Sequence, residues 1–104
     1  MEASCVFNFY GPLNRMNFLP LIYEFLGTFL LVLSIFVTGN PLVIGFVLAI
    51  TIWISASVSG GLVNPAVSLA FYMKGALTLE ELIGFVVVQF LGGMAALTTF
   101  QYVV

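Results

Sequence analysis

The chain has 104 residues, of which 62% are hydrophobic and 6% are charged, with a mean hydropathy of +1.25 and a formal net charge of −2. Because a soluble domain needs about 25% charged residues to cover its surface, this composition predicts a membrane protein. The absence of histidine and aspartate excludes His-assisted nucleophiles, histidine metal clusters and Ser-His-Asp triads, and two basic residues are too few for a nucleic-acid interface.

Residues 1–17 have an irregular composition, in which glycine, proline, asparagine and Arg15 lie among aromatic residues. Glu2 lies where a signal peptide would carry positive charge, so we expect a short interfacial tail and not a cleaved signal. Met16 is an alternative start that would remove most of this tail. Cys5 is the single cysteine, and one cysteine cannot build a disulfide framework.

Two apolar stretches follow, at about residues 18–37 and 42–58. Because roughly 20 helical residues cross the hydrocarbon core of a bilayer, the first stretch predicts a full transmembrane helix and the second a slightly short one. Between them, Thr-Gly-Asn-Pro at residues 38–41 predicts a tight turn, since glycine accepts positive φ and proline cannot continue the preceding helix. The second span has small residues suited to close helix contact, namely Gly45, Ala49, Ser55, Ala56 and Ser57.

A shorter helix is predicted at about residues 64–74, with Asn64 as its N-cap and Pro65 at its first helical position. Its length of about ten residues gives roughly 15 Å, which is half of the hydrocarbon thickness. Lys74 suits the negative end of the helix dipole, and Gly75 suits the position after a helix end. The sequence therefore predicts a half-helix that enters the membrane and returns on the same side.

The last element begins with Thr-Leu-Glu-Glu at residues 78–81, a capping box in which Thr78 and Glu81 satisfy each other's backbone amides. The apolar run that follows predicts a third span at about residues 79–104, with Gly92 and Ala96 at helical spacing on a small face. The expected fold is therefore an all-α membrane protein with three transmembrane helices and one re-entrant half-helix. These elements together cover residues 18–104.

Irregular backbone at membrane depth is tolerated only where protein buries it or where it lines a water-filled cavity. The sequence places such backbone directly before Asn64, at Gly60, Gly61, Leu62 and Val63. We expect the carbonyl oxygens of this loop to face a pore. The half-helix N-terminus would add about half a positive charge there, which repels cations and favours the oxygens of neutral solutes.

Three motifs then resemble one family. Residues 59–70, Ser-Gly-Gly-Leu-Val-Asn-Pro-Ala-Val-Ser-Leu-Ala, resemble the first Asn-Pro-Ala loop of the aquaporin, or major intrinsic protein, family. Residues 24–29, Glu-Phe-Leu-Gly-Thr-Phe, resemble the signature of its first helix, and Gln89 with residues 90–93 resembles its third-helix pattern. The resemblance covers about residues 19–104, with the motifs in the family's order.

The resemblance implies a role for each matching residue. Asn64, Pro65 and Ala66 form the pore motif, and Glu24 accepts hydrogen bonds from the loop's amides. Gln89 either supports the loop or joins two helices through a polar contact.

The chain also departs from the family's pattern. Members contain two inverted repeats, whereas this chain has the first repeat alone, without a second Asn-Pro-Ala or the filter arginine that follows it. Leu62 stands where a histidine is usual, and a leucine still offers its backbone carbonyl. Ile44 falls on a filter position that is aromatic in water-selective members, so we expect an apolar, less discriminating constriction.

The expected function is passive transport of water or small neutral solutes such as glycerol, by an integral, multi-pass membrane protein. No catalytic residue, metal, cofactor or nucleic-acid partner is expected. One repeat cannot enclose a pore, so the other half would be a second copy in inverted orientation or another aquaporin-like chain. Two alternatives stay open: a non-conducting accessory or truncated subunit, and a small proton-coupled multidrug exporter, which also carries a glutamate in its first span but has four full spans.

Overall fold

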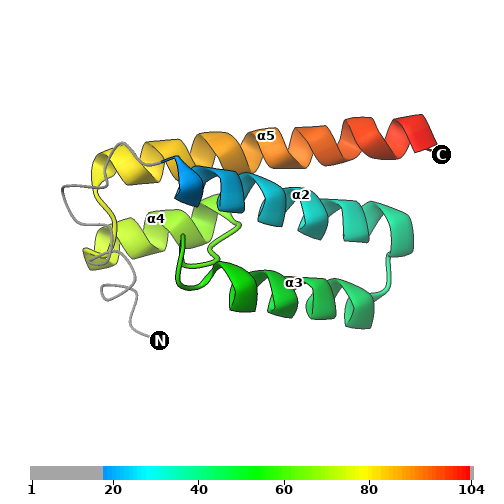
Figure 1. Ribbon diagram of the computed structural model, residues 1–104, viewed down its shortest axis with the longest axis horizontal. Coiled ribbons are helices and arrows are strands. Elements are labelled where there is room, and N and C mark those ends of the chain that lie inside the picture. The colour runs from blue at the N-terminus through cyan, green and yellow to red at the C-terminus, as the bar shows by residue number, and fades with distance from the viewer. Residues whose placement is uncertain (1–17, 104) are drawn as a thin grey trace.

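The computed structural model describes residues 18–103, which form four helices and no strand (Figure 1). The helices are α2 (Leu19–Thr38), α3 (Pro41–Ser55), α4 (Pro65–Lys74) and α5 (Leu79–Val103). The all-helical class is the one that the predicted spans and half-helix imply. The expected tail at residues 1–17, with Arg15, Cys5 and the alternative start Met16, lies outside the described residues.

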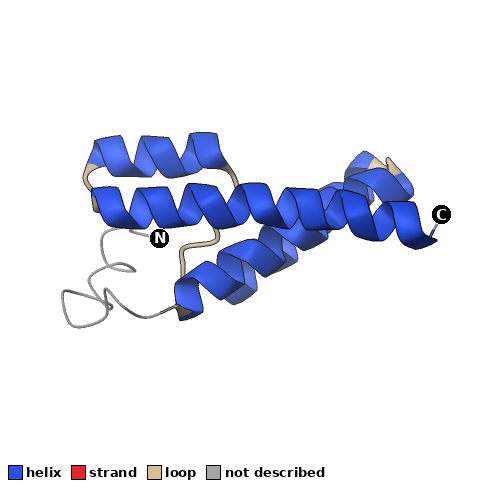
Figure 2. Ribbon diagram, turned by 90° about the horizontal axis from the view of Figure 1, so that it is seen from above, coloured by secondary structure: helices blue, strands red, loops and turns tan. Residues whose placement is uncertain are grey.

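Two of the helices, α2 with 20 residues and α5 with 25, are long and apolar enough to cross a membrane. They lie side by side and run in the same direction, and α3 returns antiparallel along α2 (Figure 1). The short helix α4 packs on the first half of α5. Seen from above, α4 runs alongside the first part of α5, and α2 passes beneath α5 at an angle, starting on the side away from α4 (Figure 2).

The predicted turn between the first two helices is confirmed. Gly39 caps the end of α2 with φ 59°, and its N–H donates to the carbonyl oxygen of Ile35. Asn40 is the N-cap of α3, where its side chain accepts from the amides of Leu42 and Val43. Since these side-chain bonds satisfy amides that have no partner within a first helical turn, the turn ends one helix and starts the next.

The predicted caps of the later helices are also confirmed. Asn64 is the N-cap of α4, and Gly75 follows its last residue with φ 95°. At the start of α5, the amide of Thr78 donates to Glu81 Oε1 at 2.8 Å, and the amide of Glu81 donates to Thr78 Oγ1 at 3.1 Å. These local bonds are encoded by neighbouring residues, so sequence spacing alone finds them.

The end of α3 differs from the expected span of residues 42–58, because the helix ends at Ser55. The amides of Val58, Ser59 and Gly60 all donate to the carbonyl oxygen of Ser55, at 2.9, 2.8 and 3.1 Å. One carbonyl that collects three amides closes the helix, and Gly60 then turns the chain away with φ 94°. The apolar pattern continues past this point, which is why the sequence predicts a longer helix.

Small residues set the crossing of α2 and α5. A Cβ atom added to Gly92 would lie 2.6 Å from the carbonyl oxygen of Phe25, and Ala96, one turn later, is completely buried. The two backbones therefore touch at Gly92, as the small face of the third span predicts. The small face predicted for the second span behaves differently, since Gly45 and Ala49 are exposed.

Candidate functional site

Glu24, in the second turn of α2, is completely buried. Its Oε1 accepts hydrogen bonds from the amide of Val63 at 2.7 Å and from Gln89 Nε2 at 2.9 Å. Its Oε2 accepts from Ser59 Oγ at 2.6 Å and from the amide of Leu62 at 3.1 Å. One side chain of α2 therefore joins the loop of residues 56–64 to α5.

Four donors match what a carboxylate offers, because its two oxygens provide about four lone-pair sites and no donor. The two amides that donate hydrogen bonds to Glu24 belong to Leu62 and Val63. They have no partner within a helix, because both residues lie between α3 and α4. A buried amide without a partner costs about 1–3 kcal/mol. Glu24 thus removes the cost of burying two loop amides without acceptors, so irregular backbone is tolerated between these helices.

These bonds also fix the direction of two carbonyl groups. In a trans peptide the C=O points opposite to the N–H of the same peptide unit, and no cis peptide occurs among the described residues. The amides of Leu62 and Val63 point at Glu24. The carbonyl oxygens of Gly61 and Leu62, which belong to the same peptide units, therefore point away from α2.

The loop adopts conformations that few residues tolerate. Gly61 has φ 65°, and a Cβ atom there would lie 2.9 Å from the Cα of Ile52, so a side chain would have to displace the α3 backbone. Val63 has φ 40° although it is β-branched, which makes it a genuine backbone outlier. Such strain persists only where surrounding contacts hold it, and here the 2.7 Å bond to Glu24 is one of them.

A second set of polar contacts continues from Glu24 to the half-helix. Gln89 Nε2 donates to Ser68 Oγ at 2.8 Å, and Ser68 Oγ donates to the carbonyl oxygen of Asn64 at 3.0 Å. Both hydrogens of the Gln89 amide are thereby used, so its Oε1 points elsewhere and is buried without a partner. Gln89 Nε2 thus contacts both the Glu24 carboxylate of α2 and the Ser68 hydroxyl of α4.

Ser59 and Ser68 belong to this cluster, and the sequence reasoning does not single them out. Both side chains are completely buried. A usable signal exists for Ser68, which lies four residues after Asn64 and therefore on the same side of α4. Ser59 has no comparable signal, because its partner Glu24 is 35 residues away.

The side chain of Asn64 is exposed. Its Oδ1 accepts from the amides of Ala66 at 2.7 Å and Val67 at 3.4 Å, which leaves the Nδ2 hydrogens as what the side chain offers outward. Pro65 is half-buried and occupies the first turn, where its missing N–H is no loss. The Asn-Pro-Ala residues thus form the N-terminal tip of α4, and the adjoining Gly60 and Gly61 are buried.

Ile44, the predicted constriction residue, lies apart from this cluster. It is half-buried in the first turn of α3, where its amide donates to the carbonyl oxygen of Asn40. Eight residues separate it from Ile52, which contacts the loop at Gly61, and this corresponds to about 12 Å along the helix axis. Ile44 and Asn64 therefore lie at two different depths of the molecule.

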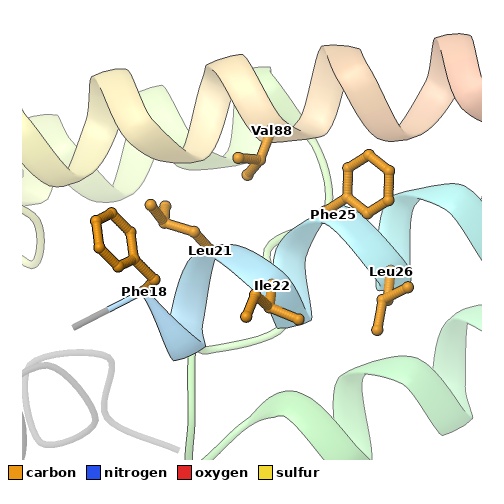
Figure 3. Close-up of a pocket in the computed structure, with 6 residues that line it drawn as sticks. All are labelled: Phe18, Leu21, Ile22, Phe25, Leu26 and Val88. Carbon is orange, nitrogen blue, oxygen red and sulfur yellow. The ribbon is translucent and has the colours of Figure 1, made fainter.

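A pocket of about 340 Å³ lies along α2 and α5 (Figure 3). Its lining side chains are all apolar: Phe18, Leu21, Ile22, Phe25, Leu26 and Val88. A binding site normally adds a few polar groups that orient a ligand. We therefore do not regard this pocket as a functional site, and the polar cluster around Glu24 and Asn64 is the better candidate.

Comparisons with known proteins point in one direction. The family described as Major intrinsic protein matches residues 37–104. The chain is 34% identical over 82 residues to the glycerol uptake facilitator protein-like 6 of Lactiplantibacillus plantarum, which covers 70% of this chain and 38% of that protein. It is 37% identical over 59 residues to the lens fiber major intrinsic protein of Gallus gallus, which covers 57% of this chain and 22% of that protein.

A third relative is the "Probable aquaporin-5" of Gibberella zeae, 36% identical over 61 residues, which cover 59% of this chain and 11% of that protein. The matches thus span from 11% to 38% of the lengths of these relatives. No solved structure matches the chain. The multidrug exporter alternative needs four full spans, whereas α4 has ten residues, and none of these relatives carries an exporter's name.

Proposed function

This chain belongs to the major intrinsic protein family and is an integral membrane protein, and from that premise we propose that it forms one half of a channel for water or small neutral solutes. The observation that carries the proposal is the tip of α4. There, Asn64 is exposed, and the loop amides before it are bound to Glu24. The proposal takes the chain as multi-pass, with α2, α3 and α5 crossing and α4 re-entrant.

The loop supports a pore through the direction of its carbonyl groups. Because Glu24 binds the amides of Leu62 and Val63, the carbonyl oxygens of Gly61 and Leu62 are directed away from α2. Carbonyl oxygens replace the hydration of a solute that donates hydrogen bonds. In the proposed pore, the carbonyl oxygens of Gly61 and Leu62 form a row, and those of Gly60 and Val63 extend it at its two ends.

Asn64 supports the same pore through its donors. Its Oδ1 is used by the first turn of α4, so its Nδ2 hydrogens face a passing oxygen. The N-terminus of a helix also carries about half a positive charge. A water or hydroxyl oxygen is attracted to this tip and a cation is repelled, which fits neutral solutes.

The second half of the channel comes from another chain in this proposal. Asn64 and the tip of α4 are exposed, and polar backbone at membrane depth has to be covered by protein or water. A second half-helix that meets the tip from the opposite side provides both. In this proposal the partner is a second copy in inverted orientation or another aquaporin-like chain, because one repeat does not enclose a pore.

Ile44 is the proposed constriction. Its aliphatic side chain offers no hydrogen bond, so selectivity rests on pore width and on the field of the half-helix. A pore of this kind admits glycerol-like solutes together with water. The glycerol uptake facilitator match is in line with this solute class, and transport of this kind needs no cofactor or catalytic residue.

Flux into proteoliposomes tests the proposal. Purified full-length chain is reconstituted, and shrinkage or swelling under osmotic water gradients and then glycerol gradients is followed by stopped-flow light scattering. We expect flux above that of empty vesicles, with no proton gradient required. Asn64→Asp places an acid at the positive helix end, so it should lower solute flux and raise cation leak.

Ile44→Trp provides the matched test of the constriction. The added ring should lower glycerol flux more than water flux, because the bulkier solute meets it first. Ile35→Trp, on an exposed position of α2, serves as a control for a tryptophan outside the proposed pore. If vesicles with wild-type chain match empty vesicles, alone and together with an aquaporin-like partner chain, the channel proposal fails and the non-conducting accessory subunit takes its place.

A further inference from the structure

Gly27 lies where α2, α3 and the loop of residues 56–64 converge, and its lack of a side chain makes room for two others. A Cβ atom at Gly27 would lie 2.7 Å from Thr51 Cγ2 and 2.7 Å from Val63 Cγ1. Threonine and valine are stiff at χ1, so neither methyl group moves aside freely. The side chain of Val63 is therefore seated directly on the backbone of α2.

Val63 is held by α2 at two points. Its amide donates to Glu24 Oε1 at 2.7 Å, and its Cγ1 rests on Gly27. Positions three residues apart lie on the same face of a helix, so the two contacts are one turn apart. Two contacts fix the orientation of a residue where a single hydrogen bond would leave it free to rotate.

This orientation is the strained one. Val63 has φ 40°, and it is the only non-glycine residue with positive φ in the described part of the chain. The following residue, Asn64, returns to an extended backbone with φ −158° and ψ 125° and starts α4. The direction of α4 and of the Asn64 side chain therefore depends on how Val63 is seated.

We propose that Gly27 and Val63 act together as positioning residues, in which the valine side chain seated on the glycine holds the left-handed turn that aims Asn64. This inference rests on the proposed function, since Asn64 is taken as a pore residue. It assigns to Gly27 a role that does not depend on helix packing alone. A larger residue at position 27 should lift Val63 and turn the half-helix tip.

The test observes Asn64 directly. Full-length chain with ¹⁵N-asparagine is placed in lipid nanodiscs, and the side-chain NH₂ resonances are recorded for wild type and Gly27→Ala. Asn40 supplies an internal reference, because it is also a helix N-cap whose side chain accepts from the next two amides. We expect the Asn64 NH₂ resonances to move and those of Asn40 to stay.

Two further variants give the matched controls. Gly45→Ala makes the same change in a helix where a Cβ atom meets nothing within 4 Å, so it should leave the Asn64 resonances in place. A compensated variant, Gly27→Ala with Val63→Ala and Thr51→Ser, removes both methyl groups that the new Cβ would meet. It should bring the Asn64 resonances back toward their wild-type positions.

Val63→Gly keeps the test decisive if Gly27→Ala does not fold. Glycine adopts positive φ without strain and keeps the amide that binds Glu24, but it has no side chain to rest on Gly27. We expect the Asn64 resonances to broaden or split. If the Asn64 resonances stay sharp and unshifted while the chain only becomes more stable, the valine side chain does not position Asn64 and the proposal is overturned.

Transport separates this inference from the proposed function. Movement of the Asn64 resonances in Gly27→Ala, together with a wild type that does not conduct, supports the positioning and rejects the channel. Unchanged Asn64 resonances in Gly27→Ala, together with a wild type that conducts, reject the positioning and leave the channel intact.

Discussion

The crossing of α2 with α5 and the exposed side of α3 differ in how they use small residues. At the crossing, Gly92 brings two backbones into contact and Ala96 is completely buried. On α3, Gly45 and Ala49 form a similar small surface, yet both are exposed and a Cβ atom at Gly45 meets nothing within 4 Å. A small-residue face thus permits close contact, and it does not by itself show where the contact forms.

Polar partners distinguish the two faces. The α2–α5 contact includes the bond between Gln89 and Glu24 at 2.9 Å, while the exposed side of α3 carries Trp53, which is 79% exposed. Lipid tails are as apolar as large aliphatic side chains, so moving such a side chain from lipid to a helix contact gains little. Packing and polar contacts therefore decide which helix face turns inward. The buried polar and charged residues are Glu24, Thr28, Ser34, Thr51, Ser55, Ser59, Ser68 and Gln89. Of these, Thr28 Oγ1 has no hydrogen-bond partner among the described residues.

Of the changes that test this comparison, removal of the Glu24 side chain should lower the thermal stability most. Glu24→Ala leaves the amides of Leu62 and Val63 buried without an acceptor, at a cost of about 1–3 kcal/mol each. Glu24→Gln keeps a partial acceptor and should cost less. Thermal unfolding in detergent measures both, with Glu80→Ala, an exposed acid at the start of α5, as the control. Unchanged stability of Glu24→Ala would show that the polar cluster does not hold the loop.

Forcing α2 and α5 apart at Gly92 should cause the second-largest loss of thermal stability. Gly92→Ala places a Cβ atom 2.6 Å from the carbonyl oxygen of Phe25, and such overpacking costs about 1–3 kcal/mol. Gly93→Ala is the matched control, because its Cβ atom would meet Val32 Cγ2 at an ordinary 3.8 Å. The melting temperatures in detergent should fall for the first variant and not for the second. Equal melting temperatures would argue against close contact at Gly92.

A smaller loss is expected at the half-helix. Ser68→Ala removes the link between Gln89 and the carbonyl oxygen of Asn64, which should cost about 0.5–1.5 kcal/mol. Thr98→Ala removes a hydroxyl that bonds the Met94 carbonyl four residues earlier and is exposed, so it should change stability little. The difference between the two variants, measured by thermal unfolding, reports the buried contact. If Thr98→Ala costs as much, burial of the serine is not what matters.

The smallest change in stability should come from a substitution in α3, and this substitution should stabilise the chain. Gly45→Ala removes a flexible residue from a helix interior without any clash, which should stabilise the isolated chain by about 0.5–1 kcal/mol. Chemical crosslinking in membranes adds a second measurement. A loss of crosslinked dimer in Gly45→Leu, with Phe46→Leu as a control on a neighbouring exposed position, would show that the small face of α3 packs against a partner.

The local patterns of the sequence determine much of this fold. The half-helix expected at residues 64–74 appears as Pro65–Lys74, and the first span expected at residues 18–37 appears as Leu19–Thr38. The caps at Asn64 and Thr78 follow from side chains that reach amides two or three residues away. Such short-range signals need no knowledge of the rest of the chain.

Only the tertiary structure decides the rest. Glu24 meets its partners 35 to 65 residues further along the chain, and no spacing rule identifies Ser59 as a member of that cluster. The positive φ of Val63 is likewise accompanied by a distant contact, the bond of its amide to Glu24. The early end of α3 at Ser55 coincides with bonds among residues 55–60, which the apolar pattern does not reveal. In an apolar solvent, every amide outside a helix needs an acceptor, and the position of that acceptor is fixed only when α2, the loop and α5 come together.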